Sequence, residues 1–298
     1  MVCKLLPKHY VMGFKESIYN ISPIFFQNIL ISAYGFQWKE RRFGGVFRQE
    51  FYAAKERENY SVEQWNNYQE QQLRKILLHA FEQVPFYKDA FTREGLDIRK
   101  LSTLQPDSIA TLPVLSKQDL RKCGTSTLLS SVRENKGAFF SSSGSTGTPT
   151  QILFSTAMHQ RWMALFEQRV RSWAGVSSFI PRGMIGGRRV LPGAANTPPY
   201  YRYNYFEKQA YFSAYHISKK NSISYLEGIL RHKVAYMTGY AMSNYFLAQF
   251  FKETGLEAPP LKAVITSSEK LTIEMRDVFS AVYGCKTYDG WSGVEACG

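Results

Sequence analysis

The sequence predicts an α/β protein with a parallel sheet flanked by helices, and its last third carries the three supporting observations. Two short apolar runs, at residues 234–237 and 261–265, have the length and content of buried strands, and residues 285–291 form a third extended segment. Helical spacing separates them: a helix through residues 245–251 ends near Gly255, and Thr272 and Gly284 bracket the next as N-cap and C-terminal stop. Because the connections are short, we expect right-handed crossovers between parallel strands.

Residues 1–60 are expected to form a helical extension packed on the core, ahead of the main domain at residues 61–298. The side chains that predict a loosely amphipathic helix here are Ile24, Phe25, Asn28, Ile29, Ile31 and Ser32. The basic run at residues 39–42 follows them, and a basic amphipathic helix can lie on an anionic membrane. We interpret it instead as a helix whose apolar stripe faces the core and whose charged end is solvated.

The middle of the chain predicts shorter elements. Apolar residues recur at helical spacing through residues 60–84, and Pro85 ends that helix. Residues 96–137 predict short helices and turns, and residues 156–173 predict a helix. Glycine, proline and arginine dominate residues 177–205, which predicts loops and short strands.

Composition is that of an ordinary globular protein, since 44% of the 298 residues are hydrophobic and 20% are charged. The net charge of +13 favours anionic partners without choosing between phosphates, nucleic acid and a membrane surface. The four cysteines lie far apart and form no CxxC pair, which excludes a disulfide scaffold and favours a reducing compartment. No signal-peptide core and no apolar run of roughly 20 residues is present, so we expect a cytoplasmic protein.

The strongest chemical signal is a run of small and hydroxyl residues between two apolar segments: Ser142, Ser143, Gly144, Ser145, Thr146 and Gly147. Glycines allow a tight turn that directs backbone N–H groups at a ligand, and hydroxyls add donors for phosphate oxygens. The run is not a Walker A loop, because Thr148 stands where that motif has lysine. A flexible linker has a similar composition, so composition alone leaves both interpretations open.

Three motifs together resemble one enzyme superfamily. Residues 142–150, SSGSTGTPT, resemble the phosphate-binding loop of adenylate-forming enzymes (the acyl-CoA synthetase superfamily), in the branch of phenylacetate–CoA ligase and coenzyme F390 synthetase. Residues 266–272, TSSEKLT, are similar to that branch's adenine-contacting turn, and residues 288–295, YDGWSGVE, to its aromatic-Gly-x-Thr-Glu motif. The motifs occur in family order. Residues 22–45 and 215–218 are closer to a subgroup associated with capsular polysaccharide biosynthesis.

This resemblance implies the large N-terminal domain of the adenylate-forming fold, with residues 61–298 as the AMP-binding domain. It implies ATP-dependent activation of a small carboxylate to an acyl-adenylate, followed by thioester formation with coenzyme A. The glycine-rich loop would hold the β- and γ-phosphates, and Thr146 and Glu295 would be catalytic, Glu295 as the Mg²⁺ ligand. The nucleotide-binding residues of the second and third motifs would be Ser268, Glu269, Tyr288, Asp289 and Trp291.

The chain departs from the family pattern near its end. Ser292 stands where glycine is usual, and Val294 where a hydroxyl residue is usual. Gly298 comes before the segment that in the family carries the ribose-binding aspartate, the hinge and the small C-terminal domain with the adenylation lysine. We therefore expect a fragment of a larger enzyme, missing that small domain and inactive alone. Cys297 resembles one ligand of a structural Zn²⁺ site whose other ligands would lie in the full-length protein.

Aromatic and basic residues outside the motifs are candidates for the substrate pocket. His216 ends an aromatic stretch and could orient the carboxylate, although a histidine beside aromatic residues is also typical of a structural role. Tyr240, at the end of a predicted strand, could equally line the acyl pocket or pack in the core. We interpret Arg188 and Arg189 as a solvated basic loop, with contact to a phosphate or a coenzyme A tail as the alternative.

Two other functions remain as hypotheses. A nucleotide-binding but catalytically silent relative, acting in surface polysaccharide assembly, would fit the altered third motif. The hypothesis of nucleic-acid binding rests on the net charge alone. We do not expect such binding, because the basic residues form no cluster interleaved with aromatic residues. The identity of the carboxylate, the acceptor and the oligomeric state do not follow from the sequence.

Overall fold

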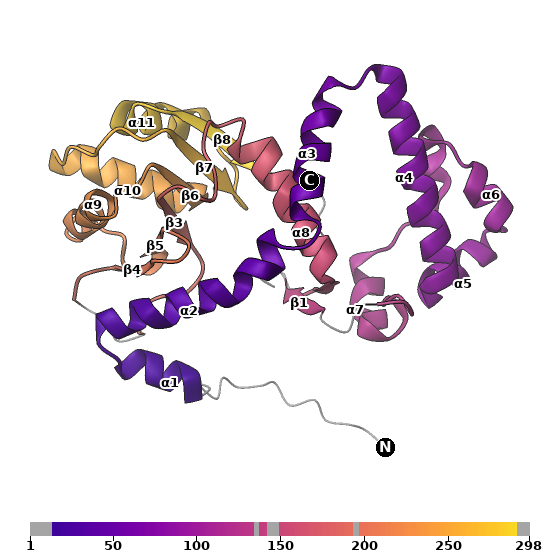
Figure 1. The fold of residues 1–298 in the computed structure, drawn as a ribbon, viewed down its shortest axis with the longest axis horizontal. Helices are drawn as coiled ribbons and strands as arrows, with labels where there is room; N and C mark the ends of the chain where they lie inside the picture. The colour runs from indigo at the N-terminus through magenta and orange to yellow at the C-terminus, as the bar shows by residue number, and fades with distance from the viewer. Residues whose placement is uncertain (1–13, 134–136, 142–148, 193–196, 291–298) are drawn as a thin grey trace. The chain divides into compact units, whose positions relative to one another are not determined.

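The computed structural model describes residues 14–133, 137–141, 149–192 and 197–290 (Figure 1). This part of the chain divides into two compact units. The first unit comprises residues 14–40 and 166–290, and the second comprises residues 41–165.

A six-stranded sheet lies at the centre of the first unit, in the order β4-β5-β3-β6-β7-β8. Its strands are β3 Arg182–Gly186, β4 Tyr201–Asn204, β5 Gln209–Ser213, β6 Tyr236–Tyr240, β7 Ala263–Ser267 and β8 Lys286–Gly290. The run from β5 to β8 is parallel, and β4 pairs antiparallel with β5 at the edge. The predicted parallel sheet is confirmed, and the antiparallel edge strand is an addition to it.

Three helices cover one face of this sheet: α9 Ser222–Arg231, α10 Ala241–Thr254 and α11 Ile273–Tyr283 (Figure 1). The predicted C-terminal end of α10 and both predicted ends of α11 are confirmed. The Thr272 hydroxyl accepts a hydrogen bond from the backbone N–H of Met275 at 3.2 Å, and Gly255 and Gly284 adopt the left-handed conformation that terminates helices. The central core between the helices and the sheet is apolar and fully buried, and includes Phe251 and Phe279.

Helix α2, Ile24–Phe43, follows the short helix α1, Phe14–Ile21, and runs along the edge strand β4. The backbone N–H of Tyr203 donates to Asn28 Oδ1 at 2.9 Å, and that of Tyr205 donates to Ser32 Oγ at 2.9 Å. These side chains satisfy N–H groups that an edge strand leaves unpaired. The polar side of α2 therefore faces the sheet.

The expectation that the apolar stripe of α2 faces the core is therefore wrong for most of its residues. Phe25 is 69% exposed and Ile29 is 41% exposed, whereas Gln27 is buried. Ile31 alone among the predicted stripe packs partly against the central core. No helix in the described ranges is long and apolar enough to span a bilayer.

The second unit is mainly helical. Its helices are α3 Phe47–Glu56, η1 Arg57–Asn59, α4 Val62–Gln83, α5 Pro85–Arg93, α6 Ile98–Thr103, η2 Pro106–Thr111, α7 Lys117–Thr127 and α8 Thr156–Phe166. Pro85 separates α4 from α5, as predicted. Strands β1 Ala138–Ser141 and β2 Gln151–Phe154 form an antiparallel pair that flanks the glycine-rich loop. The strand–loop–strand interpretation of that region is confirmed for both strands.

A short π-helical turn, η3 Glu167–Arg171, lies at the start of residues 166–290, the segment of the first unit that contains the six-stranded sheet. The buried Glu167 carboxylate accepts hydrogen bonds from the Ser178 backbone N–H at 2.9 Å and from the Ser178 hydroxyl at 2.6 Å. It also forms an ion pair with Arg171 Nη1 at 3.0 Å. Because all these groups are buried or nearly so, the network fixes the segment between η3 and β3.

Candidate functional site

The carboxyl ends of the parallel strands bring two predicted motifs to one edge of the sheet. Tyr240 at the end of β6 pairs with Ser267 at the end of β7, and Ser267 pairs with Gly290 at the end of β8. The turn after β7 and the segment after β8 thus leave from neighbouring strands. Ligands of open α/β sheets bind beyond this edge, so we consider it the candidate site.

The turn after β7 is held to the start of α10 by a carboxylate. Glu269 Oε2 accepts a hydrogen bond from the backbone N–H of Met242 at 2.8 Å. A negative charge is favourable there, because the first N–H groups of a helix lack partners and form the positive end of its dipole. Ser268, which precedes Glu269, has a φ of +69°, a conformation uncommon for residues other than glycine. Both side chains are exposed and able to meet a ligand.

Tyr240 is placed by a close approach of β6 to β3. Gly239 has a φ of +121°, and a Cβ atom there would lie 1.9 Å from the carbonyl oxygen of Ile185. Only glycine fits this position. Tyr240 follows as the N-cap of α10, and its hydroxyl lies beside Gly187, where an added Cβ would be 2.6 Å away. The phenol of Tyr240 therefore covers the end of β3.

His216 lies just after the end of β5, in the short helix η4 Ala214–His216. Its Nδ1 shares a hydrogen bond with Ser213 Oγ at 2.8 Å, and its ring stacks on Tyr200 with centroids 5.1 Å apart. The backbone carbonyl of His216 accepts from Asn221 Nδ2 at 2.9 Å. These contacts fix the ring, and Nε2 is the ring nitrogen for which the described chain supplies no partner. The structural interactions and a role at the site are thus compatible.

The last residues of β8 have different surroundings. Tyr288 is partly buried against the small cluster that contains Ala263 and Ile265. Asp289 is exposed, and its Oδ1 lies 3.4 Å from the Thr266 hydroxyl on the neighbouring strand. Tyr288 thus packs against the sheet, while Asp289 presents a carboxylate near the candidate edge.

Several predicted site residues lie outside the residues that the structure describes. They are the glycine-rich loop residues Ser142, Ser143, Gly144, Ser145, Thr146 and Gly147, the third-motif residues Trp291 and Glu295, and the zinc-ligand candidate Cys297. Their predicted roles remain predictions. Within the described ranges, no group of three or more His, Cys, Asp or Glu side chains is arranged to hold a metal ion.

Sequence reasoning missed the groups that support the glycine-rich loop's two strands. Arg41 Nη2 donates to the carbonyl oxygen of Phe154 in β2 at 2.8 Å. The buried His159 ring contacts Phe140 in β1, with centroids 5.3 Å apart, and also Phe154. Burial, together with the charges of Arg41 and Arg42, lowers the pKa of His159 to about 4, so its imidazole is neutral at pH 7. No sequence pattern pairs Arg41 with Phe154, which lies 113 residues further along the chain.

Comparison with known proteins gives two kinds of relative, although no protein-family model matches the chain. Protein CapK from Staphylococcus aureus is 23% identical over 280 residues, which cover 93% of this chain and 60% of CapK. The phenylacetate–coenzyme A ligase of Escherichia coli (strain K12) is 31% identical over 121 residues, which cover 40% of this chain and 26% of that enzyme. The chain is thus similar over most of its length to CapK and over a shorter stretch to the phenylacetate–CoA ligases.

Solved structures of adenylate-forming enzymes have the same fold. 2-Hydroxyisobutyryl-CoA ligase, solved with 2-HIB-AMP and CoA in the thioesterification state, superposes with a TM-score of 0.55 and 21% identity, covering 78% of this chain and 50% of that one. Its open conformation gives a TM-score of 0.54, covering 54% of that chain. The predicted fold class is therefore confirmed, and the two curated relatives confirm the predicted resemblance to the CapK and phenylacetate–CoA ligase branch. The chain spans about 60% of the length of CapK and about half that of the solved ligase.

Proposed function

We propose that this adenylate-forming protein activates a small carboxylate with ATP and then transfers the acyl group to a thiol such as that of coenzyme A. One observation carries the proposal: the turn containing Ser268 and Glu269 and the start of the third motif leave from adjacent parallel strands at one edge. In the family pattern these two segments flank the adenine. The relationship to the phenylacetate–CoA ligases supports the same reaction.

The proposed reaction has two displacement steps. A carboxylate oxygen of the substrate attacks the α-phosphorus of ATP in line, the bond to the β-phosphate oxygen breaks, and pyrophosphate leaves. The sulfur of the thiol, having lost its proton, then attacks the acyl carbon, and AMP leaves with the bonding electron pair. Both steps depend on holding the reactants in line and on neutralising phosphate charge.

We assign residues of this chain to the phosphates, to the adenosine and to the acyl group. We assign the phosphates to Ser142, Ser143, Gly144, Ser145, Thr146 and Gly147, and the adenosine to Ser268, Glu269, Tyr288, Asp289 and Trp291. His216 and Tyr240 are assigned to the acyl group, because both follow strand ends at the same edge of the sheet. His216 would direct Nε2 at the carboxylate, since Nδ1 is engaged by Ser213.

The two metal ions differ in how well the described residues fit them. Mg²⁺ prefers oxygen ligands and keeps several waters, and the exposed Ser268 hydroxyl and Asp289 carboxylate at this edge are donors of that type. Glu295 is assigned as its protein ligand, and bound Mg²⁺ would neutralise phosphate charge. Zn²⁺ needs about four ligands that include deprotonated thiols. The predicted ligand Cys297 lies outside the residues that the structure describes, so the zinc site stays a prediction for the full-length protein.

Calorimetric titration of the chain with AMP and with Mg·ATP tests the nucleotide part of the proposal. We expect binding that Gly144→Asp and Glu295→Ala each weaken, because the first adds charge to the phosphate loop and the second removes the Mg²⁺ ligand. Glu257→Ala is the matched control, since Glu257 is exposed and belongs to none of the three motifs. Equal affinities in all four proteins would exclude the assigned site.

Trapping of acyl-adenylates with hydroxylamine, over a panel of carboxylates, tests the chemistry. Nucleotide binding with no hydroxamate from any carboxylate would instead favour the second candidate function, a catalytically silent relative in surface polysaccharide biosynthesis. Two observations favour this alternative: the match to CapK covers 93% of the chain, and Ser292 and Val294 depart from the family's third motif.

A further inference from the structure

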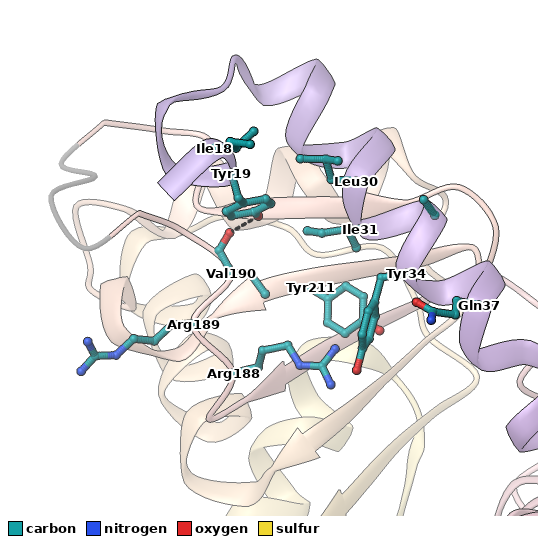
Figure 2. Close-up of a pocket in the computed structure, with 11 residues that line it drawn as sticks. Ile18, Tyr19, Leu30, Ile31, Tyr34, Gln37, Arg188, Arg189, Val190 and Tyr211 are labelled. Atoms are coloured by element: carbon teal, nitrogen blue, oxygen red, sulfur yellow. Dashed lines mark hydrogen bonds between the residues drawn. The ribbon is translucent and has the colours of Figure 1, made fainter. Parts of the chain in front are cut away.

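A cavity of about 620 Å³ between helices α1 and α2 and the segment after β3 has no part in the function proposed above (Figure 2). Its volume is within the range of small-molecule sites. Ile18, Leu30, Ile31 and Val190 supply much of its apolar wall. None of the residues assigned to nucleotide or acyl binding lines it.

The walls of this cavity are tied together by hydrogen bonds. Tyr19 Oη on α1 donates to the carbonyl oxygen of Val190, after β3, at 2.6 Å (Figure 2). Burial raises the pKa of Tyr19 to about 12, so the phenol stays neutral and keeps this donor at pH 7. On the other wall, Asn28 and Ser32 tie α2 to the edge strand β4. The cavity is therefore preformed and does not depend on a ligand to hold it open.

Arg188 supplies a positive charge on this cavity. Its guanidinium lies 5.7 Å from the ring centroid of Tyr34 on α2 and 5.6 Å from that of Tyr211 on β5. Both distances are within the range of cation–π attraction, which orients the group. Among the described residues no carboxylate forms an ion pair with Arg188, and the side chain is exposed.

The neighbouring Arg189 also lines the cavity, but its guanidinium has a different environment. Its guanidinium lies over the ring of Tyr215, 5.4 Å from the centroid, and Figure 2 shows it directed away from Tyr34 and Tyr211. The two arginines thus have the same charge and similar exposure but different directions. This difference makes Arg189 a matched control for Arg188.

We propose that this cavity binds a small amphipathic anion, whose apolar body lies against Ile18, Leu30 and Ile31 and whose carboxylate or phosphate pairs with Arg188. A guanidinium forms paired hydrogen bonds with either oxyanion, and the apolar wall removes an alkyl or aryl body from water. The same cation disfavours an amphipath with a positive head. Binding here requires neither the glycine-rich loop nor a nucleotide.

Calorimetric titration of the 298-residue chain with four ten-carbon probes tests the proposal: decanoate, decyl phosphate, decanol and decyltrimethylammonium. We expect at least one of the two anions to bind about tenfold or more tightly than decanol, and the cation not to bind, since a charge-assisted pair contributes about 1.5–3 kcal/mol. The two anionic probes distinguish a carboxylate ligand from a phosphate ligand. Decanol or the cation binding as tightly as both anions would overturn the proposal.

Three variants locate the binding, all at exposed positions, with melting curves to verify folding. Arg188→Met should weaken binding of the anion about tenfold and leave the affinity for decanol unchanged. Arg189→Met should change the affinity for the anion less than about threefold. Ala33→Trp should abolish binding of both the anion and decanol, because Ala33 lines the cavity and the larger side chain would fill it. Equal losses from the two arginine variants, or full binding by Ala33→Trp, would overturn the proposal. Nucleotide titrations are independent of these outcomes, so failure of one proposal does not affect the other.

Discussion

Replacement of Gly239 by alanine tests the close pairing of β3 and β6 that places the candidate site. A Cβ at Gly239 would lie 1.9 Å from the carbonyl oxygen of Ile185 and 2.7 Å from its carbonyl carbon. Both are backbone atoms in the middle of the sheet, so only separation of the two strands relieves the overlap. The φ of +121° adds strain of about 1–3 kcal/mol, and overpacking costs about 1–3 kcal/mol more. We expect the free energy of unfolding to fall by about 4 kcal/mol.

Urea denaturation followed by circular dichroism measures this loss, and Gly255→Ala provides the control. Gly255 also has a positive φ, +67°, but an added Cβ there meets no atom within 4 Å. This variant therefore reports backbone strain without the clash, at a cost of about 1–2 kcal/mol. The difference between the two variants is the cost of the clash. Equal losses in Gly239→Ala and Gly255→Ala would refute the reasoning.

Three further predictions use the same denaturation assay or calorimetry. Glu167→Gln removes the buried charge that pairs with the largely buried Arg171, and should lower the free energy of unfolding by about 3 kcal/mol. Glu50→Gln, at an exposed ion pair, should lower it by less than about 1 kcal/mol. Similar losses in the two variants would contradict this. The pKa of His159 is lowered to about 4 in the folded protein, against about 6.5 for an unperturbed histidine. The contribution of neutral His159 to the free energy of unfolding is therefore fully present above about pH 6.5, and it is lost as the pH falls through 4. Urea midpoints should fall across that window, and His159→Gln should flatten part of the fall; an unchanged slope would exclude His159 as a source. Glu269→Gln should weaken AMP binding about two- to tenfold, and an unchanged affinity would remove Glu269 from the site.

The last third of the fold could be predicted from the sequence because its signals are local. Thr272 as a cap and Gly255 and Gly284 as stops act within one helical turn, so the pattern is visible in a short window. Short connections then restrict the strands to a parallel arrangement. The edge strand β4 could not be predicted from the hydrophobic pattern, because its polar residues Arg202 and Asn204 are buried. Their partners come from α2, which lies far away in the sequence.

The candidate site was predictable only to the level of motifs. Ser268 and Glu269 were found as a turn before a helix, and the structure adds that Glu269 bonds to the start of α10, a contact with another segment. Gly239 is one of 21 glycines, and its requirement arises from Ile185 on the neighbouring strand. The sequence predicts Arg188 as a solvated loop residue, because its two aromatic partners come from separate elements of the fold. Such pairings depend on tertiary structure, which periodicity does not encode.

The reversed polarity of α2 leads to a prediction opposite to the usual rule for amphipathic helices. Asn28→Leu places an apolar residue on the side that faces the protein, yet it removes the acceptor for the backbone N–H of Tyr203. We expect a loss of about 1–3 kcal/mol, the cost of leaving such a donor unsatisfied. Phe25→Gln changes an apolar residue that is 69% exposed and should alter stability by less than about 0.5 kcal/mol. A stabilised Asn28→Leu together with a destabilised Phe25→Gln in urea denaturation would mean that α2 buries its apolar side. The walls of the cavity beneath α2 would then differ from those that place Arg188 against Tyr34.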